Sequence, residues 1–223
     1  MSAQAATPLA EQIADFKAES AKHLPPDVAA IFTKQAEQLK AAAIPVGVAS
    51  VGMPLPDAQM LDALGEPTSI YAMTGERPTV LVFYRGAWCP YCNLALKAYG
   101  EQLFPQLADR GVELVAISPQ KPDESLSLKE KHELAFPVLS DPGNAFARRL
   151  GVLADARSAD VRGAQEQLGL DLPATNADGT EAIPMPTIVI ADVARTIRWI
   201  DVRPDYTDRT EPSEIIAALD AIL

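Results

Sequence analysis

Residues 79–92 read Thr-Val-Leu-Val-Phe-Tyr-Arg-Gly-Ala-Trp-Cys-Pro-Tyr-Cys, and this stretch decides the fold. The apolar, β-branched and aromatic residues 79–84 predict a buried strand. Two cysteines follow at once, and residues 91–109 have the pattern of a helix, which Pro105 is expected to kink. The stretch therefore places a thiol pair where a buried strand gives way to a helix.

The segments after residue 92 alternate between strands and helices. Strands are predicted at 112–118, 136–140, 187–191 and 196–200, and helices at 122–133, 144–150 and 212–223. Strands separated by helices pair in parallel, whereas the last two strands flank a turn and form an antiparallel hairpin. This order predicts an α/β protein, a thioredoxin-like three-layer sandwich with a mixed central sheet. Residues 153–183 are polar and partly helical, and suit either a loop over the site or an inert insertion.

Residues 1–48 form a predicted N-terminal helical extension, and residues 49–223 the thioredoxin-fold domain. Apolar residues recur in the extension at three-to-four spacing, and Pro25 and Pro26 divide it into two helices. Such a hairpin either packs on its own domain or forms the contact of a homodimer.

The composition excludes several classes of partner. The net charge is −11, and no basic cluster is present to bind nucleic acid. No stretch approaches the roughly 20 apolar residues of a membrane span. Residues 1–20 lack the apolar core of a secretory signal, so a cytoplasmic protein is expected.

Cys89 and Cys92 are the only cysteines. In a reducing compartment this spacing marks redox or metal chemistry more often than a structural disulfide. A zinc site would need further ligands, and only His23 and His132 could add nitrogen, neither of them near another candidate. We therefore expect thiol chemistry without a metal or cofactor, although two inert core cysteines are an alternative.

The position of Cys89 suggests how the thiols work. At a helix N-terminus, free N–H groups and the helix dipole favour the thiolate, so a lowered pKa is expected for Cys89. Arg85 adds positive potential, and Pro90 occupies the first helical position, where its missing N–H costs nothing. Cys92 lies one turn further on the same face. The expected roles are attack by Cys89 and resolution by Cys92, beside Trp88.

Residues 183–187 read Ile-Pro-Met-Pro-Thr and lead into an apolar strand. A proline at this place predicts a cis peptide packed against the thiols. A plain turn before the strand is the alternative.

The run from Gly52 to about Asp201 resembles the peroxiredoxin family, also called alkyl hydroperoxide reductase and thiol-specific antioxidant proteins. The resemblance rests on residues 52–57, on residues 80–84 and, most specifically, on residues 136–142 followed by 150–152. It implies a thiol-dependent peroxidase for hydrogen peroxide or organic hydroperoxides. Cys89 would be the peroxidatic cysteine and Cys92 the resolving one, with thioredoxin or a similar dithiol as the reductant.

The chain departs from this family at two positions. Gly86 stands where peroxiredoxins carry a Thr or Ser hydroxyl, and Pro186 where they carry an Arg, whose place Arg85 is expected to take. At both positions the chain is similar to thioredoxin instead, in Ala87–Cys92 and in Met185–Thr187. Two alternatives to a peroxidase therefore stay open: a thioredoxin-like disulfide oxidoreductase and a non-catalytic redox sensor.

Overall fold

Strand β3 (Thr79–Phe83) is buried along its whole length and lies near the middle of the sheet. A computed structural model describes residues 7–222, and within them seven strands form one sheet in the order β2-β1-β5-β4-β3-β6-β7. β3 runs parallel to β4 (Glu113–Ser118) and antiparallel to β6 (Thr187–Ala191). The remaining strands are β1 (Gln59–Leu61), β2 (Pro67–Ser69), β5 (Val138–Ser140) and β7 (Ile197–Val202). The sheet is mixed, as predicted.

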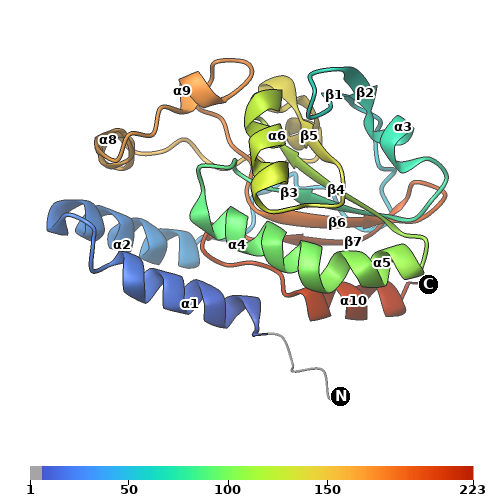
Figure 1. Cartoon of the computed structure of the whole chain (residues 1–223), viewed down its shortest axis with the longest axis horizontal. Coiled ribbons are helices and arrows are strands. Elements are labelled where there is room, and N and C mark those ends of the chain that lie inside the picture. Colours follow the sequence, from blue (N-terminus) through green and yellow to red (C-terminus); the bar gives the residue numbers. More distant parts are fainter. Residues whose placement is uncertain (1–6, 223) are drawn as a thin grey trace.

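Helices cover both faces of the sheet (Figure 1). One face packs against α4 (Pro90–Ala98), α5 (Phe104–Asp109), α6 (Pro122–Lys131) and α10 (Pro212–Asp220). The other face packs against α3 (Ile70–Thr74) and α7 (Ala145–Arg149), which follows the short 3-10 turn η2 (Pro142–Asn144). Because β3 is buried from both sides, its side chains enter two separate cores. The predicted three-layer α/β fold is confirmed.

The helix predicted after the cysteines is interrupted at Pro105. A π-helical turn, η1 (Tyr99–Leu103), separates α4 from α5, and the N–H of Phe104 bonds to the carbonyl of Tyr99, five residues earlier. The wider turn accommodates the proline, which lacks an N–H and would crowd the preceding carbonyls of a regular helix. The expected kink is therefore a change of helix type.

The N-terminal hairpin contacts the rest of the domain. It consists of α1 (Leu9–Ser20) and α2 (Pro26–Lys40), and its part before residue 7 lies outside the described residues. Leu9 and Ile13 are buried in the same core as α4. The carboxylate of Glu211 accepts the N–H groups of Leu9 (3.0 Å) and Ala10 (2.6 Å), which have no partner within the helix. Helix α1 is thus fixed at its first turn, while the homodimer and the boundary at residue 48 stay predictions.

Residues 153–183 contain two short helices, α8 (Ala159–Gln167) and α9 (Leu172–Thr175). Isolated β-bridges attach the segment at Leu153–Pro184 and Gln120–Asn176, and α8 lies against α2. Figure 1 shows α8 and α2 on the same side of the molecule as the start of α4.

The expected cis peptide is absent, because every peptide bond in residues 7–222 is trans. With trans peptides, the backbone groups next to the two prolines already have hydrogen-bond partners. The N–H of Met185 bonds to Val152 (2.8 Å), and the carbonyl of Pro186 accepts the N–H of Arg203 (2.9 Å). The proline segment is therefore the plain lead into β6 that was the alternative.

The turn between β3 and α4 requires glycine at position 86. Gly86 has φ +145°, and a Cβ there would collide with the indole of Trp88. It would also come within 3.0 Å of Gln120 Oε1, which accepts the N–H of Ala87 at 2.5 Å. Because the indole of Trp88 fills the space beside Gly86, the Ser or Thr of the peroxiredoxin pattern does not fit at position 86.

We expect Gly86→Ala to destabilise the protein by about 1–3 kcal/mol, because both the backbone conformation and the indole oppose a side chain. Chemical denaturation of the reduced protein measures the effect. Gly163→Ala is the control, since a Cβ at Gly163 in α8 meets nothing within 4 Å. Equal stabilities of the two variants would contradict the requirement for glycine.

Leu9→Ala is expected to lower the free energy of unfolding by about 2–5 kcal/mol, as for other buried leucines. Leu9 is fully buried, whereas Leu64 is 74% exposed, so Leu64→Ala should change stability by less than about 0.5 kcal/mol. Thermal or chemical unfolding compares the two. A harmless Leu9→Ala would show that the hairpin is an appendage rather than part of the core.

Candidate active site

The two cysteines lie where β3 ends and α4 begins. Cys89 is the N-cap residue of α4, and Pro90 is its first residue, as predicted. The carbonyl of Cys89 accepts the N–H groups of Cys92 (3.0 Å) and Asn93 (3.1 Å), which places Cys92 one turn along the helix. Both thiols are free and buried, with exposed fractions of 1% for Cys89 and 0% for Cys92.

Arg209 approaches both sulfurs. Its Nη2 lies 3.2 Å from the sulfur of Cys92 and 3.9 Å from that of Cys89. The side chain is only 7% exposed, and its Nη1 donates to the carbonyls of Tyr206 and Asp208. Arg209 belongs to the segment between β7 and α10 and is 120 residues from Cys89. Sequence reasoning missed it, because no motif surrounds it.

Pro186 stands at the position where the family pattern has an arginine. It lies beside Cys92, against a minor cavity that Arg209 also lines. The positive charge expected near the thiols is therefore present, but it comes from a different segment of the chain.

Arg85 is the second cation at the site. Its guanidinium carbon lies 4.0 Å from the ring centroid of Tyr206 and 4.8 Å from that of Trp88. This aromatic packing keeps the charge in place at 4% exposure. Burial raises the pKa of Cys89, and the neighbouring charge of Arg85 opposes that rise. The backbone N–H of Arg85 points to the sulfur of Cys92 at 3.5 Å.

The geometry favours Cys92 as the charged sulfur of the pair, because Arg209 Nη2 lies nearer to it than to Cys89 and the N–H of Arg85 also points at it. Burial opposes its ionisation, but the Cys89 thiol, Arg209 and the Arg85 N–H lower the pKa of Cys92 to about 5. Burial and the adjacent Cys92 raise the pKa of Cys89 well above its ordinary value. The expectation of a lowered pKa at Cys89 is therefore wrong for the reduced pair. Its side chain makes no capping hydrogen bond, and Arg209 lies nearer to Cys92.

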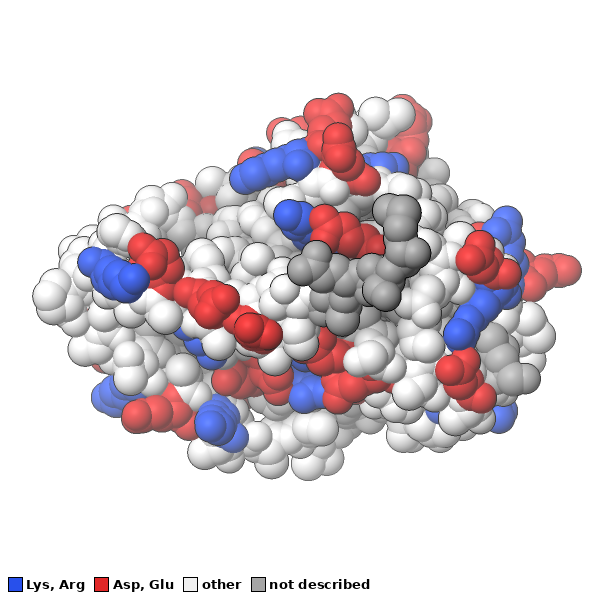
Figure 2. Space-filling model, turned by 60° about the horizontal axis from the view of Figure 1, so that its bottom comes forward, with Lys and Arg blue, Asp and Glu red and all other residues white. Residues whose placement is uncertain are grey.

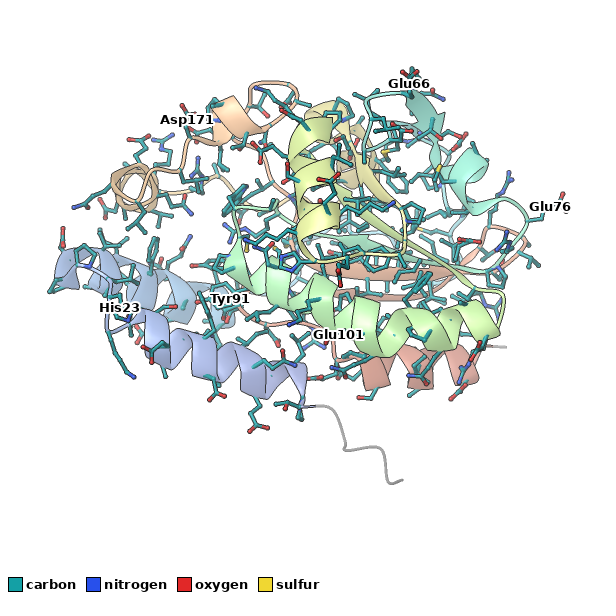
Figure 3. The ribbon with its side chains drawn as sticks, viewed as in Figure 1. His23, Glu66, Glu76, Tyr91, Glu101 and Asp171 are labelled. Carbon is teal, nitrogen blue, oxygen red and sulfur yellow. The ribbon has the colours of Figure 1, made fainter. Side chains whose placement is uncertain are left out.

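Aromatic side chains connect this turn to the N-terminal hairpin. Tyr91, labelled in Figure 3, projects from the start of α4 toward α1 and α2. Its ring packs edge-on against Phe16 at 5.4 Å and lies 6.0 Å from the ring of Tyr206. The hydroxyl of Tyr206 donates to Gln35 Oε1 at 3.1 Å. The hairpin thereby borders the site.

A cavity of about 1090 Å³ opens onto the site between the hairpin, the end of α8 and residues 203–209. Cys89, Arg85 and Tyr91 contribute to its floor, whereas Cys92 lies behind Cys89 and does not line it. Access from the cavity thus distinguishes the two thiols: a ligand meets Cys89 first.

One face of the molecule shows how its charged side chains are distributed. On the face in Figure 2, Lys and Arg side chains lie among Asp and Glu without a continuous basic patch. Within residues 7–222, no helix has the length and apolar character to cross a membrane. In the same residues, no three His, Cys, Asp or Glu side chains gather as metal ligands would.

Known proteins resemble this chain in sequence and in fold. The AhpC/TSA family model matches residues 51–200, more than half of the chain. A chloroplastic peroxiredoxin Q from Oryza sativa subsp. japonica is 30% identical over 109 residues, 49% of each protein. The thiol-disulfide oxidoreductase ResA from Bacillus cereus is 25% identical over 104 residues, 46% of this chain and 58% of ResA. The chain thus spans about half the length of the curated relatives it matches.

Solved structures support the fold. Peroxidoxin BcpB from Mycobacterium tuberculosis superposes with a TM-score of 0.59 at 20% identity, covering 78% of this chain and 97% of BcpB. A peroxiredoxin-like protein from Aquifex aeolicus reaches 0.61 at 15% identity, with 79% and 89% covered. With the matched region spanning the strand, the cysteine pair and most of the late hairpin, the chain belongs to the AhpC/TSA family.

Proposed function

We propose that the protein is a thiol-dependent peroxidase in which Cys89 attacks a hydroperoxide and Cys92 resolves the product. The observation that carries the proposal is the placement of Cys89, Arg85 and Arg209 against one cavity, with the second thiol, Cys92, directly behind Cys89 and in contact with Arg209. Cys89 faces the cavity, Cys92 lies behind it, and Arg209 neutralises the charge that the pair holds. Family membership supports the same class of reaction.

The resting pair supplies its own proton acceptor. The thiol proton of Cys89 passes to the Cys92 thiolate, and the sulfur of Cys89 then attacks the terminal oxygen of the hydroperoxide. The O–O bond breaks, Cys89 becomes a sulfenic acid, and the alkoxide takes the proton from Cys92 and leaves as an alcohol. Arg85 is positioned to stabilise the negative oxygen that develops.

The second half of the reaction forms a disulfide. The Cys92 thiolate attacks the sulfur of the Cys89 sulfenic acid, and hydroxide leaves and takes up a proton as water. The thiol pair has then lost two electrons, which the hydroperoxide has gained. Thioredoxin or a similar dithiol would restore the pair by attacking Cys89, the sulfur nearer to the cavity.

A disulfide oxidoreductase is the second candidate function. The sequence Trp88–Cys92 and the likeness to ResA favour it. In that case the Cys89–Cys92 disulfide would exchange with a substrate dithiol or disulfide, with the same attacking and resolving sulfurs. A redox sensor would be oxidised once without turnover.

Stopped-flow oxidation of the reduced protein by hydrogen peroxide and by an organic hydroperoxide tests the peroxidase. We expect Cys89→Ser to abolish rapid oxidation, and Cys92→Ser to stop at a sulfenic acid that dimedone labels. If Cys89 reacts no faster than a free thiol, the proposal is wrong. Rapid reduction of insulin disulfides in that case would establish the second candidate.

Titration of thiolate absorbance at 240 nm tests the charge at the site. Because the pKa of Cys92 is lowered to about 5, one thiolate should persist at neutral pH and disappear as the pH falls through about 5. Oxidation of Cys89 by peroxide should slow over the same range, since protonated Cys92 no longer accepts a proton. Cys92→Ser should remove this transition.

Arg209→Met is expected to shift the midpoint of this titration upward, and Arg209→Lys to shift it less, because the charge is kept. Arg198→Met, at an exposed position on β7, should leave the midpoint unchanged and serves as the control. An unchanged midpoint in Arg209→Met would show that Arg209 does not stabilise the thiolate.

A further inference from the structure

The cavity over Cys89 joins an apolar wall to a cationic floor. Its volume of about 1090 Å³ is comparable with pockets that enclose whole organic ligands, about 300–1,000 Å³. The wall comes from the N-terminal hairpin and the end of α8. Its apolar side chains are Ile13, Phe16, Leu24, Phe32, Leu39 and Leu168. A continuous wall of this kind favours a ligand with an extended apolar part, because both surfaces then leave water.

The charged residues around the cavity favour an anion. Five basic side chains line it against three acidic ones, in a chain whose net charge is −11. A positive excess remains even when the thiolate of Cys92, behind the floor, is counted. The basic residues are Lys17, Lys40, Arg85, Arg203 and Arg209, and the acidic ones are Glu37, Asp205 and Asp208. The cavity therefore attracts negative charge although the whole protein repels it.

Arg85 is the buried cation that lacks an acceptor. Arg203 forms ion pairs with neighbouring carboxylates, and Arg209 donates to two carbonyls. Within residues 7–222, by contrast, the guanidinium of Arg85 forms no hydrogen bond or ion pair. It is 4% exposed, packs on Trp88 and Tyr206, and lines the cavity. An oxygen anion supplied by a ligand would satisfy this guanidinium with charge-assisted hydrogen bonds.

We propose that the cavity binds a carboxylate with a long apolar tail, a ligand of the fatty-acid class. The carboxylate lies against Arg85, and the tail runs along the wall formed by the hairpin and α8. One unpaired cation suits the single charge of a carboxylate better than the multiple charges of a phosphate ester. The continuous apolar wall suits an alkyl tail better than a peptide. The ligand undergoes no reaction, so this inference goes beyond the proposed peroxidase and does not depend on it.

A ligand in this position covers the reactive thiol. Arg85 and Cys89 both line the cavity, so a carboxylate on Arg85 obstructs the approach to the Cys89 sulfur. Helices α1 and α2, which supply most of the wall, precede residue 51, where the match to the family begins. The hairpin thus makes access to the thiol depend on whether a ligand is bound.

Calorimetric titration of the reduced, full-length protein with laurate, below its critical micelle concentration, tests the binding. We expect one saturable site per chain. Octanoate should bind more weakly by about fourfold for each methylene removed from the buried tail, and acetate should not bind measurably. Dodecanol has the same tail without the charge and should bind roughly 10- to 100-fold more weakly. Absence of a saturable laurate site would overturn the inference.

Two variants separate the head of the ligand from its tail. Arg85→Met should weaken laurate to the affinity of dodecanol and leave dodecanol unchanged, which also shows that the cavity has formed. Arg85→Lys should lie between. Ala36→Phe fills the cavity and should weaken both ligands by about tenfold or more. Ala30→Phe is the matched control, because Ala30 is exposed on the same helix and does not line the cavity. Undiminished laurate binding in Arg85→Met would contradict the assigned carboxylate position.

Alkylation by iodoacetamide tests whether the ligand covers Cys89. In Cys92→Ser, Cys89 is the only thiol, and saturating laurate should slow its alkylation whereas acetate should not. Adding Arg85→Met should remove the protection at the same laurate concentration. An unchanged rate with laurate bound would place the ligand away from Cys89 and overturn the inference. No peroxide enters these measurements, so their failure and the failure of the proposed peroxidase are distinguishable.

Discussion

Arg209 is a buried cation, and the arrangement of the site depends on how its charge is compensated. Burying an unpaired guanidinium costs several kcal/mol, so a partner is required. Within residues 7–222 no carboxylate forms an ion pair with it: two carbonyls and the sulfurs of Cys89 and Cys92 surround it. The thiolate on Cys92 supplies the counter-charge, which a disulfide removes. In the proposed reaction cycle, this contact favours the reduced pair over the disulfide.

The same requirement distinguishes the two cysteines of this helical turn by their charge and by their access to the cavity. The charged sulfur is the deeper one, where Arg209 is nearest, and the neutral sulfur faces the cavity. In the proposed mechanism, the Cys89 thiol gives its proton to Cys92 and becomes nucleophilic beside Arg85. Cys92 thus carries the charge, and Cys89 is the sulfur that a ligand in the cavity can reach.

The surroundings of the thiols combine the region that the AhpC/TSA model matches with a turn that departs from the peroxiredoxin pattern at Gly86. The match to the AhpC/TSA family covers β3, the cysteine pair and most of the late hairpin. The turn is different: the indole of Trp88 folds over Gly86 and, with Tyr206, encloses Arg85. Tyr91 and Tyr206 extend this aromatic layer to the hairpin, so the added helices are coupled to the turn itself. An element outside the family region thereby becomes part of the site.

The sequence alone determined the local features: the buried strand, the helix beginning at Pro90, the thiol pair and the α/β order of elements. Each depends on residues close in the chain, where periodicity and capping rules act. The three-residue strands β1 and β2 were missed because so short a segment carries no periodicity.

Only the tertiary structure decided which sulfur is charged, since that depends on a guanidinium 120 residues away. The cavity likewise exists only because helices from the N-terminus and from residues 159–167 meet over Cys89. Long-range electrostatics and packing leave no mark on neighbouring residues, which is why the site's chemistry could be located from the sequence but not its charge or its size.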